Sequence, residues 1–186
     1  SLIDCIVIGS ISKVLELISS SQSSQTDRLS KGQEGIVFLD QTPFYAESGG
    51  QVGDRGELIG KDLIFSVIDT QKVGDHFAHI GTVVEGNISK DNNVSAQINI
   101  ELRDKTIRNH SATHLLQAAL RKVLGDHIEQ KGSLVDSGRL RFDFTHPKSI
   151  SDEEITQIED LINQVIEKNT ETSTEIMTMK EAEKKG

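Results

Sequence analysis

The hydrophobic positions of the first hundred residues form short runs that alternate with polar breaks. The runs are rich in Ile, Val and Leu, and glycine-bearing or serine-rich segments separate them, a pattern typical of β-strands joined by turns. Six short strands at this spacing predict a small antiparallel barrel or sandwich. The expected strands are CIVIGSI (5–11), KVLELI (13–18), GIVFLD (35–40), DLIFSVIDT (62–70), HFAHIGTVV (76–84) and VSAQINI (94–100).

The period of the hydrophobic pattern changes after Glu101. From about Lys105 to Leu124, apolar residues recur at i, i+4, i+7 and i+8, which predicts a helix with one buried face. Gly125 is a natural end for this helix. Residues 139–145 (RLRFDFT) then alternate between charged and apolar residues, which predicts a half-buried strand after the segment 128–135 (IEQKGSLV).

The C-terminal pattern predicts further α and β elements. Ser151 and Glu154 form a capping box that opens a helix ending near Asn169. Residues 174–179 (TEIMTM) predict another strand, and 180–186 (KEAEKKG) predict the start of a helix. Since this last pattern stops abruptly, we expect the sequence to be a piece of a longer protein.

The fold class predicted from these elements is α+β. A small antiparallel β-barrel is expected over residues 1–100. An α+β two-layer domain with helices on an antiparallel sheet is expected over residues 101–186, truncated at its C-terminus.

The composition indicates the cellular location of the protein, and the distribution of charge indicates a possible binding surface. The single cysteine, Cys5, excludes an internal disulfide and fits a cytoplasmic location. No apolar run approaches the roughly 20 residues of a membrane span, so no membrane association is expected. The net charge of −9 argues against nucleic-acid binding by the chain as a whole. Residues 103–148, however, hold nine Lys and Arg against five Asp and Glu. That segment is either a solvated helix face or a surface for a polyanion.

The basic segment carries two histidines in RNHSATHLLQAAL (108–120). About one helical turn separates His110 and His114, so both project from one face and could bind one metal ion. A zinc peptidase needs a glutamate after the first histidine, and Ser111 stands there instead, which excludes that class. Zinc sites normally need three or four ligands, and the sequence has no C-x-x-C. The alternative is that both histidines are ordinary surface or core residues.

A second unusual stretch is DQTPFYAESGGQVGDRGEL (40–58). Its four glycines require tight turns or a close approach to the backbone. It is not a G-x-G-x-x-G motif and opens no helix, so a dinucleotide site is not expected. Two interpretations stay open: hairpin turns of the barrel, or exposed N–H groups that bind a ribose, a carboxylate or a phosphate.

Three segments of the chain, in this order, resemble the editing region of alanyl-tRNA synthetases. They are FYAESGGQVGDRG, RNHSATHLLQAALRKVLG and HIEQKGSLVDSGRLRFDFTHP. Free-standing alanyl-tRNA editing proteins are similar, and the editing domain of threonyl-tRNA synthetase is more distantly so. The resemblance implies zinc-dependent hydrolysis of the ester in mischarged Ser-tRNA(Ala) or Gly-tRNA(Ala). It also implies an enzyme that attaches alanine to tRNA(Ala) using ATP, which would bind outside this segment.

The resemblance also implies roles for particular residues and partners. His110 and His114 match the first two zinc ligands of the family. Thr113 and Gln130 match positions tied to substrate discrimination and editing, and are the expected catalytic residues. The implied partners are the acceptor end of tRNA(Ala) and the remainder of the synthetase chain. The expected substrate-binding residues are Ser48, Gly49, Gly50 and Arg108, and other candidates for phosphate contacts are Arg121, Lys122, Lys131 and Arg141.

The family completes its zinc site with a C-x-x-x-H motif that does not occur in this sequence. We therefore expect an incomplete site that binds zinc weakly or not at all in this segment alone. A free-standing editing protein is not favoured, because it would carry a complete zinc site. The alternative function is a non-catalytic tRNA-binding or packing module in which the histidines are structural.

Overall fold

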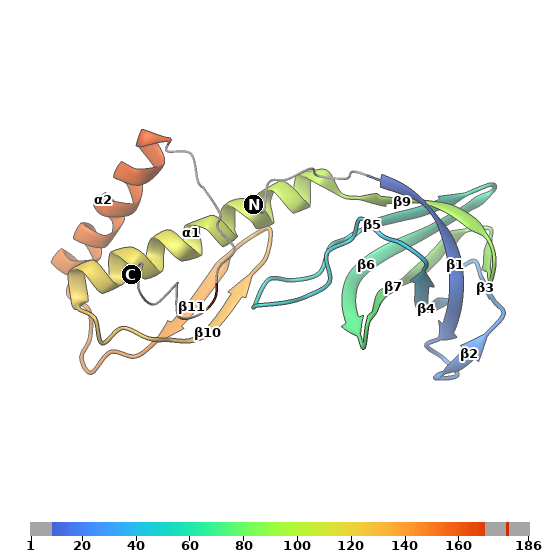
Figure 1. Ribbon diagram of the computed structural model, residues 1–186, viewed down its shortest axis with the longest axis horizontal. Coiled ribbons are helices and arrows are strands. Elements are labelled where there is room, and N and C mark those ends of the chain that lie inside the picture. Colours follow the sequence, from blue (N-terminus) through green and yellow to red (C-terminus); the bar gives the residue numbers. More distant parts are fainter. Residues whose placement is uncertain (1–8, 170–177, 179–186) are drawn as a thin grey trace.

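A computed structural model of the chain, which describes residues 9–169 and residue 178, has an α+β fold in two parts (Figure 1). A closed β-barrel comes first, and a unit of two helices and a β-hairpin follows it. The predicted fold class is therefore confirmed. No helix in the described part of the chain has the length and apolar character needed to cross a membrane.

The barrel is antiparallel and closes on itself, because its first and last strands pair with each other. Its strands alternate buried and exposed residues, as one-sided burial requires. Buried aliphatic side chains and Phe65 fill the interior. The six barrel strands, in spatial order, are β1 (Gly9–Ser19), β4 (Glu34–Leu39), β7 (His76–Glu85), β6 (Leu63–Val73), β5 (Gly56–Gly60) and β9 (Asn93–Ile98).

Three short strands lie outside this closed set. They are β2 (Ser24–Thr26), which pairs with β1, and the paired strands β3 (Arg28–Ser30) and β8 (Asn87–Ser89). All three lie in segments that the sequence predicts to be breaks between strands: β2 and β3 in residues 19–34, and β8 in residues 85–93.

Three of the predicted barrel strands need correction, and one barrel strand was not predicted. The separate strands expected at 5–11 and 13–18 form one strand, β1, over their described part, which begins at Gly9. β5 was not predicted, because its run GELIG is short and bounded by glycines. The expected strand over 94–100 ends at Ile98, where the first helix takes over.

Helix α1 (Ile100–Leu124) starts earlier than the predicted Lys105. The Asn99 side chain accepts the N–H of Leu102 and so caps the helix directly after β9. The predicted end at Gly125 is correct.

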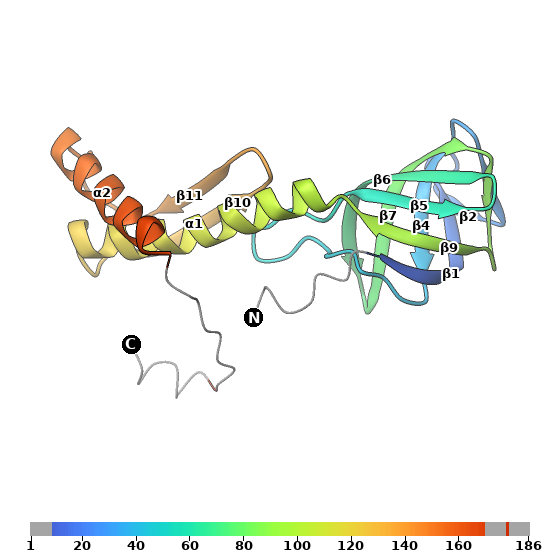
Figure 2. The same ribbon diagram turned by 90° about the horizontal axis from the view of Figure 1, so that it is seen from above.

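A hairpin of β10 (Gln130–Val135) and β11 (Leu140–Phe144) lies along α1, and α2 (Asp152–Lys168) crosses the far end of α1 (Figure 2). Their shared core consists of Ala119, Leu120, Ile128 and Ile158. The predicted capping box of α2 is present, and Asn169 ends this helix in a left-handed conformation. The strand predicted at 174–179 and the helix predicted at 180–186 lie outside the described residues, apart from residue 178, which is in neither a strand nor a helix.

Candidate functional site

The connection between β4 and β5, which we call the glycine loop (residues 40–55), contains a tight two-glycine turn. Ser48 and Gln51 exchange both backbone hydrogen bonds, at 3.1 and 3.0 Å between N and O. Between them Gly49 and Gly50 have φ angles of +60° and +83°. A two-residue turn with both central φ angles positive favours glycine at both positions, so the Ser-Gly-Gly-Gln order explains the shape of the turn.

This turn docks against the edge of β10, where the loop reaches from the barrel towards the hairpin (Figure 1). The N–H of Val135 donates to the Gly50 carbonyl at 2.7 Å, and the N–H of Val52 donates to the Val135 carbonyl at 3.0 Å. A Cβ atom on Gly50 would lie 2.5 Å from the Ser133 carbonyl oxygen, so only glycine allows this approach. The barrel segment thereby adds a short extension to the hairpin.

A buried ion pair fastens the same loop to the first turns of α1. The Asp54 carboxylate is 7% exposed and accepts hydrogen bonds from Nε of Arg103, at 2.7 Å, and from its Nη2. The backbone N–H of Tyr45 also donates to this carboxylate, and Arg103 donates to the Pro43 carbonyl. Both charges are thus compensated, and the ion pair fixes the loop relative to the helix.

The two histidines of α1 lie side by side, with ring centroids 5.0 Å apart. Nδ1 of His110 lies 2.6 Å from Oε1 of Gln51, a side chain that is only 2% exposed. Because an amide oxygen can only accept, this orientation of the Gln51 amide requires a proton on Nδ1 of His110 and a lone pair on Nε2. Burial, and secondarily the charge of His114, lower the pKa of His110, which favours the neutral, metal-binding form of the ring.

These residues fit part of a zinc site. Two imidazoles on one helix face are typical zinc ligands, and a carbonyl partner on the second ring nitrogen is the usual way to orient one. Within the described residues, no group of three or more His, Cys, Asp and Glu side chains could hold a metal ion. Among the described residues, His110 and His114 could supply two ligands of such a site.

The other predicted site residues lie at different distances from the histidine pair. Thr113 is 7% exposed, and its hydroxyl donates to the Asn109 carbonyl at 2.8 Å. Gln130 is exposed at the start of β10, five residues or about 16 Å of strand away from Val135. Arg108 is exposed and lies about 200° around the helix from His110. The structure thus brings the turn and His110 together, and it does not bring Gln130 or Arg108 into that contact.

The sequence did not predict four residues whose side chains join the glycine loop, α1 and the β10–β11 hairpin. Gln51 and Asp54 belong to the glycine stretch that we singled out, but nothing in the sequence pairs them with residues about fifty positions away. The remaining two are Arg103 and Asn109, whose side-chain amide donates to the Asp136 carbonyl at 2.7 Å.

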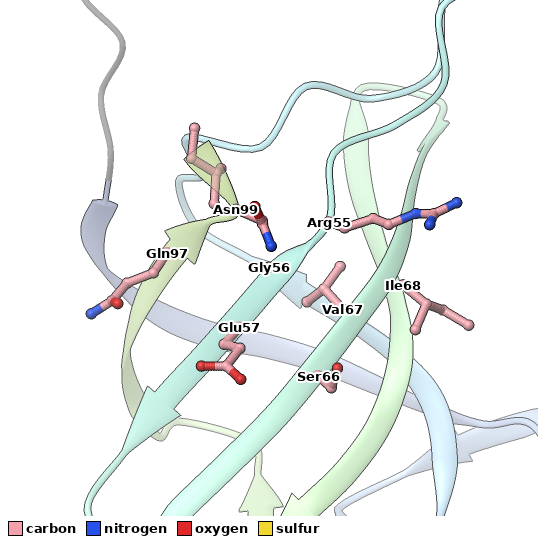
Figure 3. Close-up of a pocket in the computed structure, with 9 residues that line it drawn as sticks. Arg55, Gly56, Glu57, Ser66, Val67, Ile68, Gln97 and Asn99 are labelled. Carbon is pink, nitrogen blue, oxygen red and sulfur yellow. The ribbon is translucent and has the colours of Figure 1, made fainter. Parts of the chain in front are cut away.

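A cavity of about 480 Å³ lies on the outside of the barrel (Figure 3), and neither His110 nor His114 lines it. Figure 3 shows Gln97 on one side of it and Ile68 on the other. Its lining contains no histidine, cysteine or other strong nucleophile, so we assign no chemistry to it. A smaller cavity of about 220 Å³ lies beside the Asp54–Arg103 pair, between the glycine loop, α1 and the β10–β11 turn.

Comparison with known proteins gives a consistent family. The model of the family described as class II (A) tRNA synthetases matches residues 8–102. The alanine–tRNA ligase of Pseudomonas savastanoi pv. phaseolicola is 53% identical over 173 residues, which cover 93% of this chain and 20% of the relative. The alanine–tRNA ligase of Legionella pneumophila (strain Paris) is 46% identical over 174 residues, covering 94% and 20%. The chain thus spans about a fifth of the length of these curated relatives.

Proposed function

Because the chain belongs to the class II (A) tRNA synthetase family, we propose that it is the editing region of an alanine–tRNA ligase. In this role it hydrolyses the ester that links serine or glycine to tRNA(Ala), within an enzyme that attaches alanine to this tRNA using ATP. The observation that carries the proposal is the junction at His110, where the Gln51 amide of the glycine loop contacts a ring of the histidine pair at 2.6 Å. The structural histidine of the barrel, His79, has hydrogen-bond partners on both ring nitrogens. Among the described residues His110 has a partner on Nδ1 alone, beside the ring of His114, which is the arrangement that a metal ligand needs.

The need for such a site follows from the size of the amino acids. Glycine fits any pocket that admits alanine, and one extra or missing small group changes binding by only about 1–3 kcal/mol. A synthetic site alone therefore charges the wrong amino acid at an appreciable rate. A second site that recognises the wrong product and hydrolyses it restores accuracy.

Thr113 has the hydrogen-bonding capacity to recognise serine. Its hydroxyl proton is donated to the Asn109 carbonyl, so Oγ1 has only lone pairs to offer. An acceptor matches the hydroxyl of a seryl group and finds no partner in an alanyl group. This difference would let the site reject correctly charged Ala-tRNA(Ala).

The glycine turn offers backbone donors to the substrate. Within the part of the chain that the structure describes, the N–H groups of Gly49 and Gly50 have no hydrogen-bond partner. Two consecutive free N–H groups in a left-handed turn form a small concavity suited to a carboxylate, ribose or phosphate oxygen. Ser48 and Gly49 are exposed at its tip, where such a ligand can reach them.

His110 and His114 are the residues that would hold zinc, with further ligands from outside the described residues. When bound, zinc polarises an ester carbonyl or lowers the pKa of a water molecule. The residues of this chain orient and bind: Gln51 holds the ring of His110, and Thr113 accepts from the seryl hydroxyl. Gln130 stays a proposed catalytic residue and Arg108 a proposed substrate contact, and both would need the bound substrate to join the site.

The basic residues proposed to contact tRNA differ in whether a carboxylate of this chain already pairs with them. Arg121, Lys131 and Arg141 each lie near an exposed carboxylate, at 3.5, 3.0 and 3.1 Å. Such exposed pairs contribute little and exchange readily for a phosphate. Among the described residues, Arg108 and Lys122 have no ion-pair partner.

The experiment is deacylation of Ser-tRNA(Ala) by a full-length synthetase that contains this segment. We expect the double variant His110→Ala/His114→Ala to lose deacylation by 100-fold or more while alanine attachment is kept, on the order of the loss when essential groups are removed. His76→Ala, at an exposed position of the barrel, is the matched control. Full deacylation by the double variant would rule out the assigned role. Salt-dependent tRNA binding without hydrolysis by the unaltered enzyme would favour the non-catalytic module.

A further inference from the structure

Gln51 is the residue of the glycine loop whose side chain contacts the histidine pair of α1. We propose that Gln51 is a positioning residue that fixes the tautomer and orientation of His110. Its carbonyl oxygen accepts the Nδ1–H at 2.6 Å, so Nε2 is left as the nitrogen with a lone pair. The purpose of this arrangement rests on the proposed function, whereas the hydrogen bond itself does not.

Gln51 is held firmly enough to impose this geometry. Its backbone exchanges two hydrogen bonds with Ser48 across the glycine turn, and it bridges to Val135 of β10. The residue is 2% exposed, so water does not compete freely for the amide. A side chain fixed at its backbone and shielded from solvent orients its partner better than an exposed one.

His110 has no competing side-chain partner for Nδ1 among the described residues. Without the Gln51 oxygen this ring would be free to turn and to move its proton to Nε2. A proton on Nε2 would block the nitrogen that is otherwise available to bind a metal ion. Removing the amide should therefore act on the tautomer first and on metal affinity second.

The opposite orientation of the amide makes a distinct prediction. If the Gln51 NH₂ group faced the ring, it would donate to a bare Nδ1, and Nε2 would carry the proton. Only one of the two arrangements leaves Nε2 free. The tautomer of His110 therefore decides between them.

The test is long-range ¹H–¹⁵N NMR of the histidine rings in the ¹⁵N-labelled 186-residue chain, without metal, at pH 8. We expect His110 to carry its proton on Nδ1 in the unaltered chain. Gln51→Leu has a similar volume and no acceptor, so it should shift the ring to a mixture dominated by Nε2–H. Gln51→Glu keeps an acceptor and should keep the proton on Nδ1. Gln97→Leu, on the exposed side of β9, is the matched control and should change nothing.

A second readout is zinc affinity in a full-length synthetase that contains the segment. Gln51→Leu should weaken zinc binding by roughly 10–100-fold, the usual effect of losing an outer hydrogen bond to a ligand, and Gln51→Glu should retain it. An Nε2–H His110 in the unaltered chain, or an unchanged tautomer in Gln51→Leu, would overturn the inference. If Gln51→Leu does not fold, the tautomer of His110 in the unaltered chain and in Gln51→Glu still tests the inference. A synthetase that fails to deacylate but keeps Nδ1–H on His110 would refute the proposed function and support this inference.

Discussion

Gly49 and Gly50 share a left-handed backbone but differ in their surroundings. A Cβ atom on Gly49 meets nothing within 4 Å, whereas one on Gly50 meets the Ser133 carbonyl at 2.5 Å. Gly49→Ala should therefore lower the free energy of unfolding by about 1 kcal/mol, the backbone penalty alone. Gly50→Ala should lower it by about 3 kcal/mol, because β10 must also move. Urea denaturation of the two variants measures the difference, and equal losses would contradict the docking of the turn on β10.

His79 is a buried neutral histidine in the barrel core. Its Nδ1–H donates to the Val37 carbonyl at 2.9 Å, and its Nε2 accepts from the Thr42 hydroxyl at 2.8 Å. Burial lowers the pKa of His79 from 6.5 to about 4. Its contribution to stability is thus complete above pH 6.5 and falls between pH 6.5 and 4, because the unfolded chain binds the proton first.

We expect this histidine to account for a loss of about 2 kcal/mol between pH 7.5 and pH 5. His79→Gln can keep both hydrogen bonds without titrating, so its stability should fall by that much less over the same range. Chemical denaturation at the two pH values measures both slopes. His76→Gln, at an exposed histidine, should keep the slope of the unaltered chain. A slope that His79→Gln leaves unchanged would show that the ring is not a buried neutral group.

At the level of elements, the Asp54–Arg103 pair joins the glycine loop to α1. Both side chains are mostly buried, at 7% and 16% exposure. Removing one partner leaves a buried charge without compensation, which typically costs about 3–5 kcal/mol. Asp54→Asn and Arg103→Met should each show a loss in that range, and the double variant should recover part of it. A double variant as unstable as the sum of the two, measured by thermal unfolding, would mean that the pair is not coupled.

The elements themselves were largely predictable, because their patterns are local. The alternation in β11 and the capping box of α2 need only neighbouring residues. The predicted start of α1 is too late, because the hydrophobic pattern assigns Asn99 to the preceding strand, although its side chain is a good helix cap. The docking of Gln51 on Val135 could not be predicted, since no periodicity links positions so far apart in the chain.

At the scale of the whole molecule, the resemblance in three short segments indicated the family that the comparisons support. The division into domains near residue 100 and the roles of the site residues stay predictions. His110 and His114 could be placed on one face from their spacing alone. The contact that orients His110 depends on the fold, because it joins α1 to a loop of the barrel.

The barrel and the α+β unit have separate hydrophobic cores. The helices and strands that pack extensively against each other belong to the same unit in every case. The hydrogen bonds and the ion pair that we describe between the two units all run through the glycine loop. We therefore expect this loop to couple their unfolding. A double variant, Gln51→Leu/Asp54→Asn, should weaken the coupling without touching either core.

Hydrogen–deuterium exchange can measure this coupling region by region. In the double variant, amides of the β10–β11 hairpin should exchange at least 10-fold faster, while those of β6 and β7 keep their protection, because local opening depends on local contacts. Gln97→Leu/Asp75→Asn, at two exposed barrel positions, is the matched control and should change neither region. An equal loss of protection in the hairpin and the barrel would instead mean that the two units form one cooperative structure whose stability does not depend specifically on the loop.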